Sequence, residues 1–165
     1  MALIFKVTLT ANAFLLALIA GLFYSYTVSV NLGLGKLSDA EYLRSMQSIN
    51  REILNPWFFL SFLGTLPLLP ISTWMSSNLN GYDASFYLFL GATILYVVGV
   101  FGVTIFGNVP LNEALDRFDI NRASVEEIKN RRLIFEMPWN KLNLIRTLAN
   151  VLSLGLLLVG IIRRF

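Results

Sequence analysis

Arg146 is the residue best placed for chemistry in this 165-residue sequence. It lies in the segment Trp-Asn-Lys-Leu-Asn-Leu-Ile-Arg-Thr, residues 139–147. Helical residues three or four apart share one face, which here would carry Asn143, Arg146, Thr147 and Asn150. A charge within an apolar helix is costly, so Arg146 should face the bundle interior or a wet cavity. There it could hold an anionic or phenolic oxygen.

A structural role for Arg146 is the alternative. The side chain could snorkel to the membrane interface or hold helices together. If Arg146 faces the bundle interior, its possible partners are three acidic residues from the neighbouring polar segments: Glu52, Glu113 and Glu136.

Further polar residues should meet Arg146 at one end of the molecule. They come from the segment before the second apolar stretch, the end of the third stretch and the start of the fourth. Such convergence on a mouth between helices is typical of ligand sites. Local roles in capping or turns are the alternative. The candidate substrate-binding residues are Gln47, Asn50, Asn108, Asn112, Trp139, Asn140 and Asn143.

Several kinds of chemistry are disfavoured by composition. Histidine and cysteine are absent, which removes imidazole ligands, thiolates and disulfides. The sequence also lacks a glycine-rich phosphate loop, metal-ligand spacing and a nucleophile–base pair. We therefore expect no metal site. The pI near 9.4 does not indicate a nucleic-acid partner, because the basic residues flank apolar stretches, where they would contact lipid headgroups.

Four apolar stretches must position these residues. A bilayer core of about 30 Å needs about 20 helical residues to cross it, and lipid offers no partners for backbone groups. The sequence therefore predicts an all-α, integral membrane four-helix bundle formed as one domain over residues 1–165, with the lipid bilayer as its surroundings. The predicted spans are Leu9–Val30, Pro56–Trp74, Phe86–Phe106 and Leu142–Ile162.

Two polar segments between these spans predict amphipathic helices. Ser38 and Glu41 form a capping box before residues 42–53, whose apolar positions have helical spacing. A second capping box begins a helix over Ser124–Phe135, which Pro138 should end before the fourth span starts. A short helix is expected over Asn112–Phe118. Both polar segments should lie on one membrane face and cap the bundle.

Small residues mark two close-packing surfaces. The third span carries Gly91, Gly99, Gly102 and Gly107. In the first span, small residues recur at every fourth position, a pattern that lets another helix approach closely in lipid. A packing seam inside the monomer is the favoured interpretation, and a homo-oligomer contact is the alternative. This small-residue ridge consists of Ala13, Ala17, Gly21, Ser25, Ser29 and Gly33.

Charge indicates orientation. Four spans place both termini on one side of the membrane. Ten of the thirteen Lys and Arg residues lie in the 1–2 and 3–4 loops or the start of the fourth span. Because cytoplasmic loops are rich in Lys and Arg, the loops should be cytoplasmic and the termini non-cytoplasmic. Nine of the ten acidic residues lie in the same loops, however.

Three segments carry a family resemblance: Met46–Asn50, the Asn-Val-Pro-Leu-Asn segment 108–112, and Trp139–Thr147. Together they resemble the membrane domain-of-unknown-function family that includes the fungal anthrone oxygenases, over essentially the whole chain. The resemblance implies four transmembrane helices and oxidation of anthrones to anthraquinones by molecular oxygen without metal or flavin. Residues 133–138, Leu-Ile-Phe-Glu-Met-Pro, lack the Trp and polar aromatic that members often carry there.

Two functions remain open. In the first, the chain is a cofactor-independent oxygenase of a lipophilic phenol or anthrone-like substrate. Arg146 would stabilise an oxyanion, and Asn108, Asn140 and Asn143 would orient the ligand. In the second, it is a non-catalytic lipid-binding or assembly subunit whose Asn/Arg cluster joins helices. A roomy polar pocket would favour the first function, and a closed, satisfied cluster the second.

Overall fold

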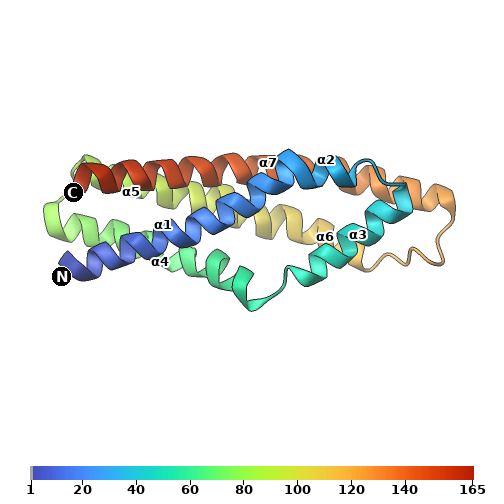
Figure 1. The fold of residues 1–165 in the computed structure, drawn as a ribbon, viewed down its shortest axis with the longest axis horizontal. Helices are drawn as coiled ribbons and strands as arrows, with labels where there is room; N and C mark the ends of the chain where they lie inside the picture. The colour runs from blue at the N-terminus through green and yellow to red at the C-terminus, as the bar shows by residue number, and fades with distance from the viewer. Residues whose placement is uncertain (1) are drawn as a thin grey trace.

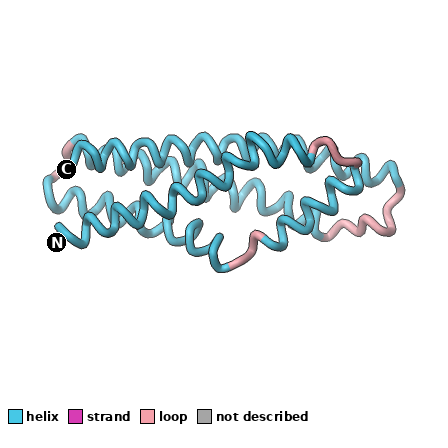
Figure 2. Tube along the Cα trace, viewed as in Figure 1, coloured by secondary structure: helices cyan, strands magenta, loops and turns pink. Residues whose placement is uncertain are grey.

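The computed structural model describes residues 2–165, which form helices and no strand (Figures 1 and 2). Within these residues, four helical rods are long and apolar enough to span a membrane, as the sequence predicts. The chain is thus a multi-pass membrane protein. The first rod comprises α1 (Ala2–Ser25), the π-helical η1 (Tyr26–Val30) and α2 (Asn31–Leu34). The second is α4 (Pro56–Asn80), which continues through Pro67 and Pro70.

The third rod is assembled from several helical pieces. It comprises α5 (Ala84–Ile94), two π-helical segments, η2 (Leu95–Gly102) and η3 (Thr104–Asn108), and α6 (Val109–Asp116). The fourth rod is the single helix α7 (Val125–Arg164), and α3 (Asp39–Glu52) lies between the first and second rods. Both termini lie at one end of the molecule, and the turn between α2 and α3 lies at the other (Figure 1).

The fourth rod is longer than a bilayer is thick. At about 1.5 Å per residue, the 40 residues of α7 extend about 60 Å, twice the thickness of a bilayer core. The 25-residue α4 is close to bilayer length. The end of the bundle formed by α2, α3, α6 and the first part of α7 therefore extends beyond the hydrocarbon layer.

Two hydrophobic cores divide the molecule along its length. The membrane core joins α1, α4, α5, η2 and α7 around buried residues such as Leu16, Leu69 and Tyr96. The outer core joins α3, α6 and the first part of α7 around Tyr42, Met46 and Leu115. Phe23 belongs to the membrane core and Trp139 to the outer core.

The expected break between the second polar segment and the fourth span is absent from α7, which covers both segments. Pro138 does not end a helix at Phe135, because α7 runs unbroken from Val125 to Arg164. The predicted capping box is present, with Ser124 N–H donating to Glu127 at 2.7 Å. The helix expected over Asn112–Phe118 is α6, which instead continues the third rod. An interior proline costs about 3 kcal/mol, which contacts with the outer core offset here.

Arg132 fastens the turn before α3 to α7. Its Nη1 donates to Leu37 O at 2.8 Å and to Asp39 Oδ1 at 2.9 Å, and its Nη2 donates to Gly35 O at 3.0 Å. Its Nε donates to Glu136, one helical turn later, at 2.7 Å. The first polar loop accordingly contains a helix, α3, which begins at the predicted capping box and buries Tyr42, Leu43 and Met46.

Three of the four glycines that predict a close-packing surface on the third rod lie against α7, whereas Gly102 does not. A Cβ atom on Gly99 would lie 2.6 Å from the Cβ of Ala149, and one on Gly107 would lie 3.0 Å from Leu142. A Cβ on Gly91 would lie 3.1 Å from Leu156. These positions bring the two helices together over most of the membrane span.

The small-residue ridge, which runs from α1 into η1 and α2 (the α1 ridge), does not form such a seam. Ala17, Gly21, Ser29 and Gly33 are exposed on the surface of the chain, and the favoured interpretation as an intramolecular seam is wrong. Large apolar residues occupy the inward side of α1 instead, together with Asn12, which donates to Leu68 O and Ser72 Oγ of α4. A contact with a second protein chain through the ridge stays a prediction.

Candidate functional site

A pocket lies at the junction of the two cores, where the spanning helices meet α3. Its volume is about 80 Å³. Its walls come from all four rods, from α3 and from the α3–α4 turn, and no Asp or Glu is among the described residues that line it. The lining residues are Leu22, Phe23, Tyr26, Ile49, Asn50, Ile53, Leu54, Phe58, Thr104, Val109, Asn112, Trp139 and Arg146.

Arg146 is the only charged side chain among these lining residues, and only 7% of its surface is exposed. Its Nε and Nη2 donate to Asn143 Oδ1 at 3.1 and 3.0 Å. The guanidinium carbon lies 4.0 Å from the ring centre of Phe23 and 5.2 Å from that of Trp139. Aromatic faces attract cations, so the site holds the guanidinium between two rings.

No carboxylate lies within 4.0 Å of Arg146 in residues 2–165, so the expected ion pair is absent. Glu136 pairs instead with Arg132 at 2.7 Å, and Glu113 pairs with Arg117 at 3.3 Å. Glu52 lies at the end of α3 and is exposed. No acidic group in the described chain neutralises the guanidinium at the pocket. An anionic oxygen bound there would therefore be attracted to it.

Asn143 fixes the position of the guanidinium by joining α7 to the first rod. Its Nδ2 donates to Thr27 Oγ1 at 2.9 Å and makes a longer contact of 3.4 Å with Phe23 O. Thr147, one turn later, donates to Phe23 O at 3.1 Å and shares a hydrogen bond with Thr27 at 3.0 Å. Because the amide nitrogen is committed to the first rod, the amide oxygen faces Arg146.

Trp139 forms a further part of the wall. Its Nε1 donates to Asn112 Oδ1 at 2.8 Å, and its ring centre lies 5.7 Å from that of Tyr26. Asn50 also lines the pocket, with a buried Nδ2 that has no hydrogen-bond partner among the described residues. The polar part of the wall is therefore rich in donors, which suits a ligand bearing an acceptor oxygen.

Two other predicted residues lie near this pocket but do not line it. Asn108 is buried, and its Nδ2 lies 3.5 Å from Trp139 O. Asn140 is half-buried. The Oδ1 atoms of both residues are buried without a protein partner in the described chain. Asn108 is thus close to the backbone of Trp139, Asn140 is its neighbour in sequence, and Asn143 binds Arg146 directly.

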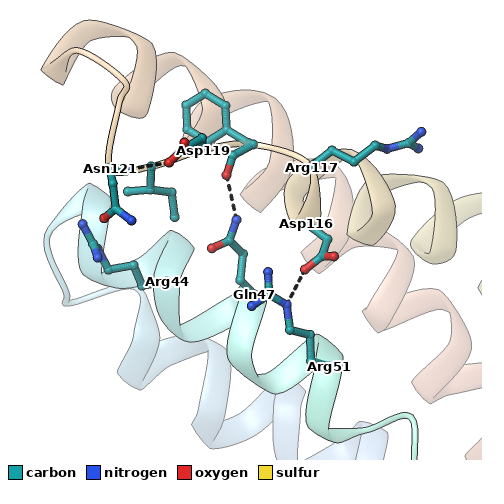
Figure 3. Close-up of a pocket in the computed structure, with 9 residues that line it drawn as sticks. Arg44, Gln47, Arg51, Asp116, Arg117, Asp119 and Asn121 are labelled. Carbon is teal, nitrogen blue, oxygen red and sulfur yellow. Dashed lines mark hydrogen bonds and ion pairs between the residues drawn. The ribbon is translucent and has the colours of Figure 1, made fainter.

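Gln47 does not join the Arg146 pocket. Its Nε2 donates to Leu115 O and Phe118 O, both at 2.9 Å, and so holds α3 against the end of α6. It faces a separate, polar pocket of about 330 Å³ at the outer end of the molecule. Figure 3 shows this pocket with Arg51 reaching Asp116, a contact of 2.6 Å. The expectation that Gln47 converges on Arg146 is wrong, because its side chain points toward the other side of α3.

The first rod contributes residues that the sequence-based site omitted. Phe23 and Tyr26 supply aromatic walls, and Thr27 anchors Asn143. Residues 23 and 27 are one turn apart at the loop-side end of the first span. This spacing is the signal that could have placed them beside the start of α7.

The fold and the pocket define a small multi-pass membrane protein in which an arginine without an acidic partner faces an aromatic pocket. The sequence model of the family described as Anthrone oxygenase matches residues 57–156. The chain belongs to this family. The matched region contains Asn112, Trp139 and Arg146, whereas Tyr26 and Asn50 lie outside it. Comparison with curated proteins gives no match, nor does comparison with solved structures.

Proposed function

We propose that this protein is a membrane oxygenase that acts without a cofactor on a lipophilic phenol or anthrone-like substrate. One observation carries the proposal: Arg146 is buried, has no carboxylate partner in the described chain, and faces a pocket without acidic residues. A preorganised cation of this kind stabilises an oxyanion more strongly than water does. Membership of the anthrone oxygenase family supports the same reaction class.

The chemistry follows from the acidity of the substrate. An anthrone or phenol loses a proton to solvent and becomes an enolate or phenolate, whose oxygen Arg146 holds. The electron-rich carbon of this anion reacts with molecular oxygen. For an anthrone, the methylene carbon loses two hydrogens and gains one oxygen atom. The second oxygen atom of O₂ leaves with those hydrogens as water.

A non-catalytic role as a lipid-binding or assembly subunit is the second candidate. The outward position of the α1 ridge favours it, since a ridge of small residues suits contact with another membrane helix. The pocket volume of about 80 Å³ also lies below the range of about 300–1,000 Å³ usual for pockets that enclose a ligand. In this role Arg146 would bind an anionic group without promoting a reaction.

Oxygen uptake separates the two candidates. The purified protein in lipid nanodiscs would be supplied with anthrone, with protein-free nanodiscs measuring spontaneous oxidation. We expect an accelerated uptake that Arg146→Gln reduces by about 100-fold, the loss typical of removing an oxyanion-binding donor. Arg163→Gln, at the exposed C-terminal end of α7, should leave the rate unchanged. No acceleration by the wild-type protein would favour the non-catalytic role.

A further inference from the structure

The Arg146 pocket has a polar floor and an apolar mouth. Arg146 and the unpartnered Nδ2 of Asn50 belong to its buried side. The mouth is formed by Leu54, with 64% of its surface exposed, and by the half-buried Leu22 and Phe58. A ligand that passes this mouth would thus meet apolar side chains first and hydrogen-bond donors last.

The mouth lies at the edge of the bilayer. Leu54 comes just before α4 begins at Pro56, and Trp57, in the first turn of α4, has 80% of its surface exposed. Tryptophan gathers at membrane–water interfaces, which places this turn at headgroup level. Leu22 and Phe58 belong to the spanning part of α1 and α4. The apolar mouth therefore borders lipid on its inner side.

The pocket is too small to enclose a polycyclic ligand. Its volume of about 80 Å³ is well below the range of about 300–1,000 Å³ of pockets that enclose a ligand. This space accommodates one oxygen-bearing group beside Arg146. The remainder of any larger ligand must lie outside, against the mouth.

We propose that the ligand is a bilayer-dissolved amphiphile that binds sideways from the leaflet. Its single acidic oxygen lies at Arg146, and its apolar body rests against Leu22, Leu54 and Phe58 while still in contact with lipid. This inference rests on the proposed function, because it assumes an oxyanion at Arg146. It adds the substrate class: a molecule with one polar end and a hydrocarbon body of unrestricted length.

A series of 2-bromo-4-alkylphenols, from methyl to dodecyl, tests this binding mode in vesicles. Bromine quenches tryptophan fluorescence on contact, and Trp139 lines the pocket. The lipid-exposed Trp57 and Trp74 would be replaced by Phe in every sample so that only Trp139 reports. Affinities would be expressed as mole fractions of probe in the bilayer, so that partitioning into lipid does not contribute.

We expect the affinity on this scale to be independent of alkyl length, because the chain stays in lipid when the phenol binds. Leu54→Asn should weaken binding of the dodecyl probe by about tenfold, since an amide replaces an apolar contact, and should affect the methyl probe little. Leu60→Asn is the matched control: Leu60 is similarly exposed on α4 but does not line the pocket.

The outcomes separate the two proposals. Loss of binding beyond a short alkyl length, with Arg146→Gln still abolishing quenching by the methyl probe, would show an enclosed ligand. That result would overturn the sideways mode and leave the oxyanion site intact. Equal effects of the Leu54 and Leu60 substitutions would also overturn the sideways mode. Quenching unchanged by Arg146→Gln would overturn the oxyanion site and, with it, the inference built on it.

Discussion

Arg146 is held by neutral groups alone. Asn143 accepts two of its hydrogen bonds, and the rings of Phe23 and Trp139 flank its guanidinium. Desolvating an ion costs several kcal/mol in proteins, and here no carboxylate in the described chain repays that cost. Arrangements of this kind sacrifice stability where function needs an available charge. Folding alone gives no reason to place an arginine at this position.

Replacing Arg146 by Met tests this interpretation. The thermal unfolding midpoint in detergent should stay unchanged or rise, because the desolvation cost disappears while the unbranched side chain still fills the space. Loss of the hydrogen bonds leaves Asn143 Oδ1 unpaired at a cost of about 1–3 kcal/mol, which the relieved desolvation offsets. Binding of the methyl phenol probe should be lost.

Arg163→Met serves as the control and should change neither the midpoint nor binding. A large fall in the midpoint for Arg146→Met, comparable to that of a core deletion, would instead identify Arg146 as a structural link between helices.

At the scale of elements, α7 organises the bundle. It packs against the glycine-bearing face of the third rod in the membrane and continues into the outer core, where Arg132 holds the turn before α3. Both cores therefore depend on one helix that stays continuous through Pro138. This continuity also sets Trp139 and Arg146 two turns apart on the same side of the pocket.

The contact between Gly99 and α7 should be intolerant of any side chain. Gly99→Ala should lower stability by about 1–3 kcal/mol, because the new Cβ would lie 2.6 Å from that of Ala149 and neither atom can rotate away. Gly155→Ala, with no atom within 4 Å of the new methyl group, should instead stabilise the helix by up to about 1 kcal/mol. Reversible unfolding in mixed detergent micelles would measure both.

A second substitution provides the decisive check. Ala149→Gly should restore much of the stability lost in Gly99→Ala, because it removes the opposing atom. If Gly99→Ala and Gly155→Ala have equal effects, the two helices do not approach as closely as the structure indicates.

At the scale of the whole molecule, the bundle is asymmetric across the bilayer. The outer core and the polar pocket of Figure 3 extend from one membrane face, and both termini lie at the other (Figure 1). The distribution of Lys and Arg predicts that the outer core faces the cytoplasm. Water from the cytoplasm would then reach the pocket from one side, and lipid would border it on the other.

Single cysteines can test this orientation, because the chain has none of its own. Asn80→Cys lies at the exposed C-terminal end of α4, and Asn121→Cys lies in the exposed loop before α7. In intact cells, a membrane-impermeant maleimide should label the cysteine at 80 and not the one at 121. Both should react after the membrane is permeabilised. The reverse pattern would place the termini in the cytoplasm.

Much of the fold was determined by the sequence alone. Apolar stretches of membrane length must form helices because lipid cannot satisfy backbone polar groups, and the four predicted spans follow from this constraint. The proximity of Asn112 to Trp139 and the burial of Arg146 follow from chain direction and the cost of exposing a charge to lipid. These inferences depend on local composition and need no knowledge of packing.

Only the tertiary structure decided which side chains meet. The continuation of α7 through Pro138 depends on the outer core, and the outward position of the α1 ridge depends on which face of α1 packs better against its neighbours. Likewise, Gln47 turns toward α6 because two backbone carbonyls there accept its amide. The carboxylates of Glu136 and Glu113 pair with Arg132 and Arg117 and not with Arg146. Such competition among partners is long-range, and spacing along the chain does not encode its outcome.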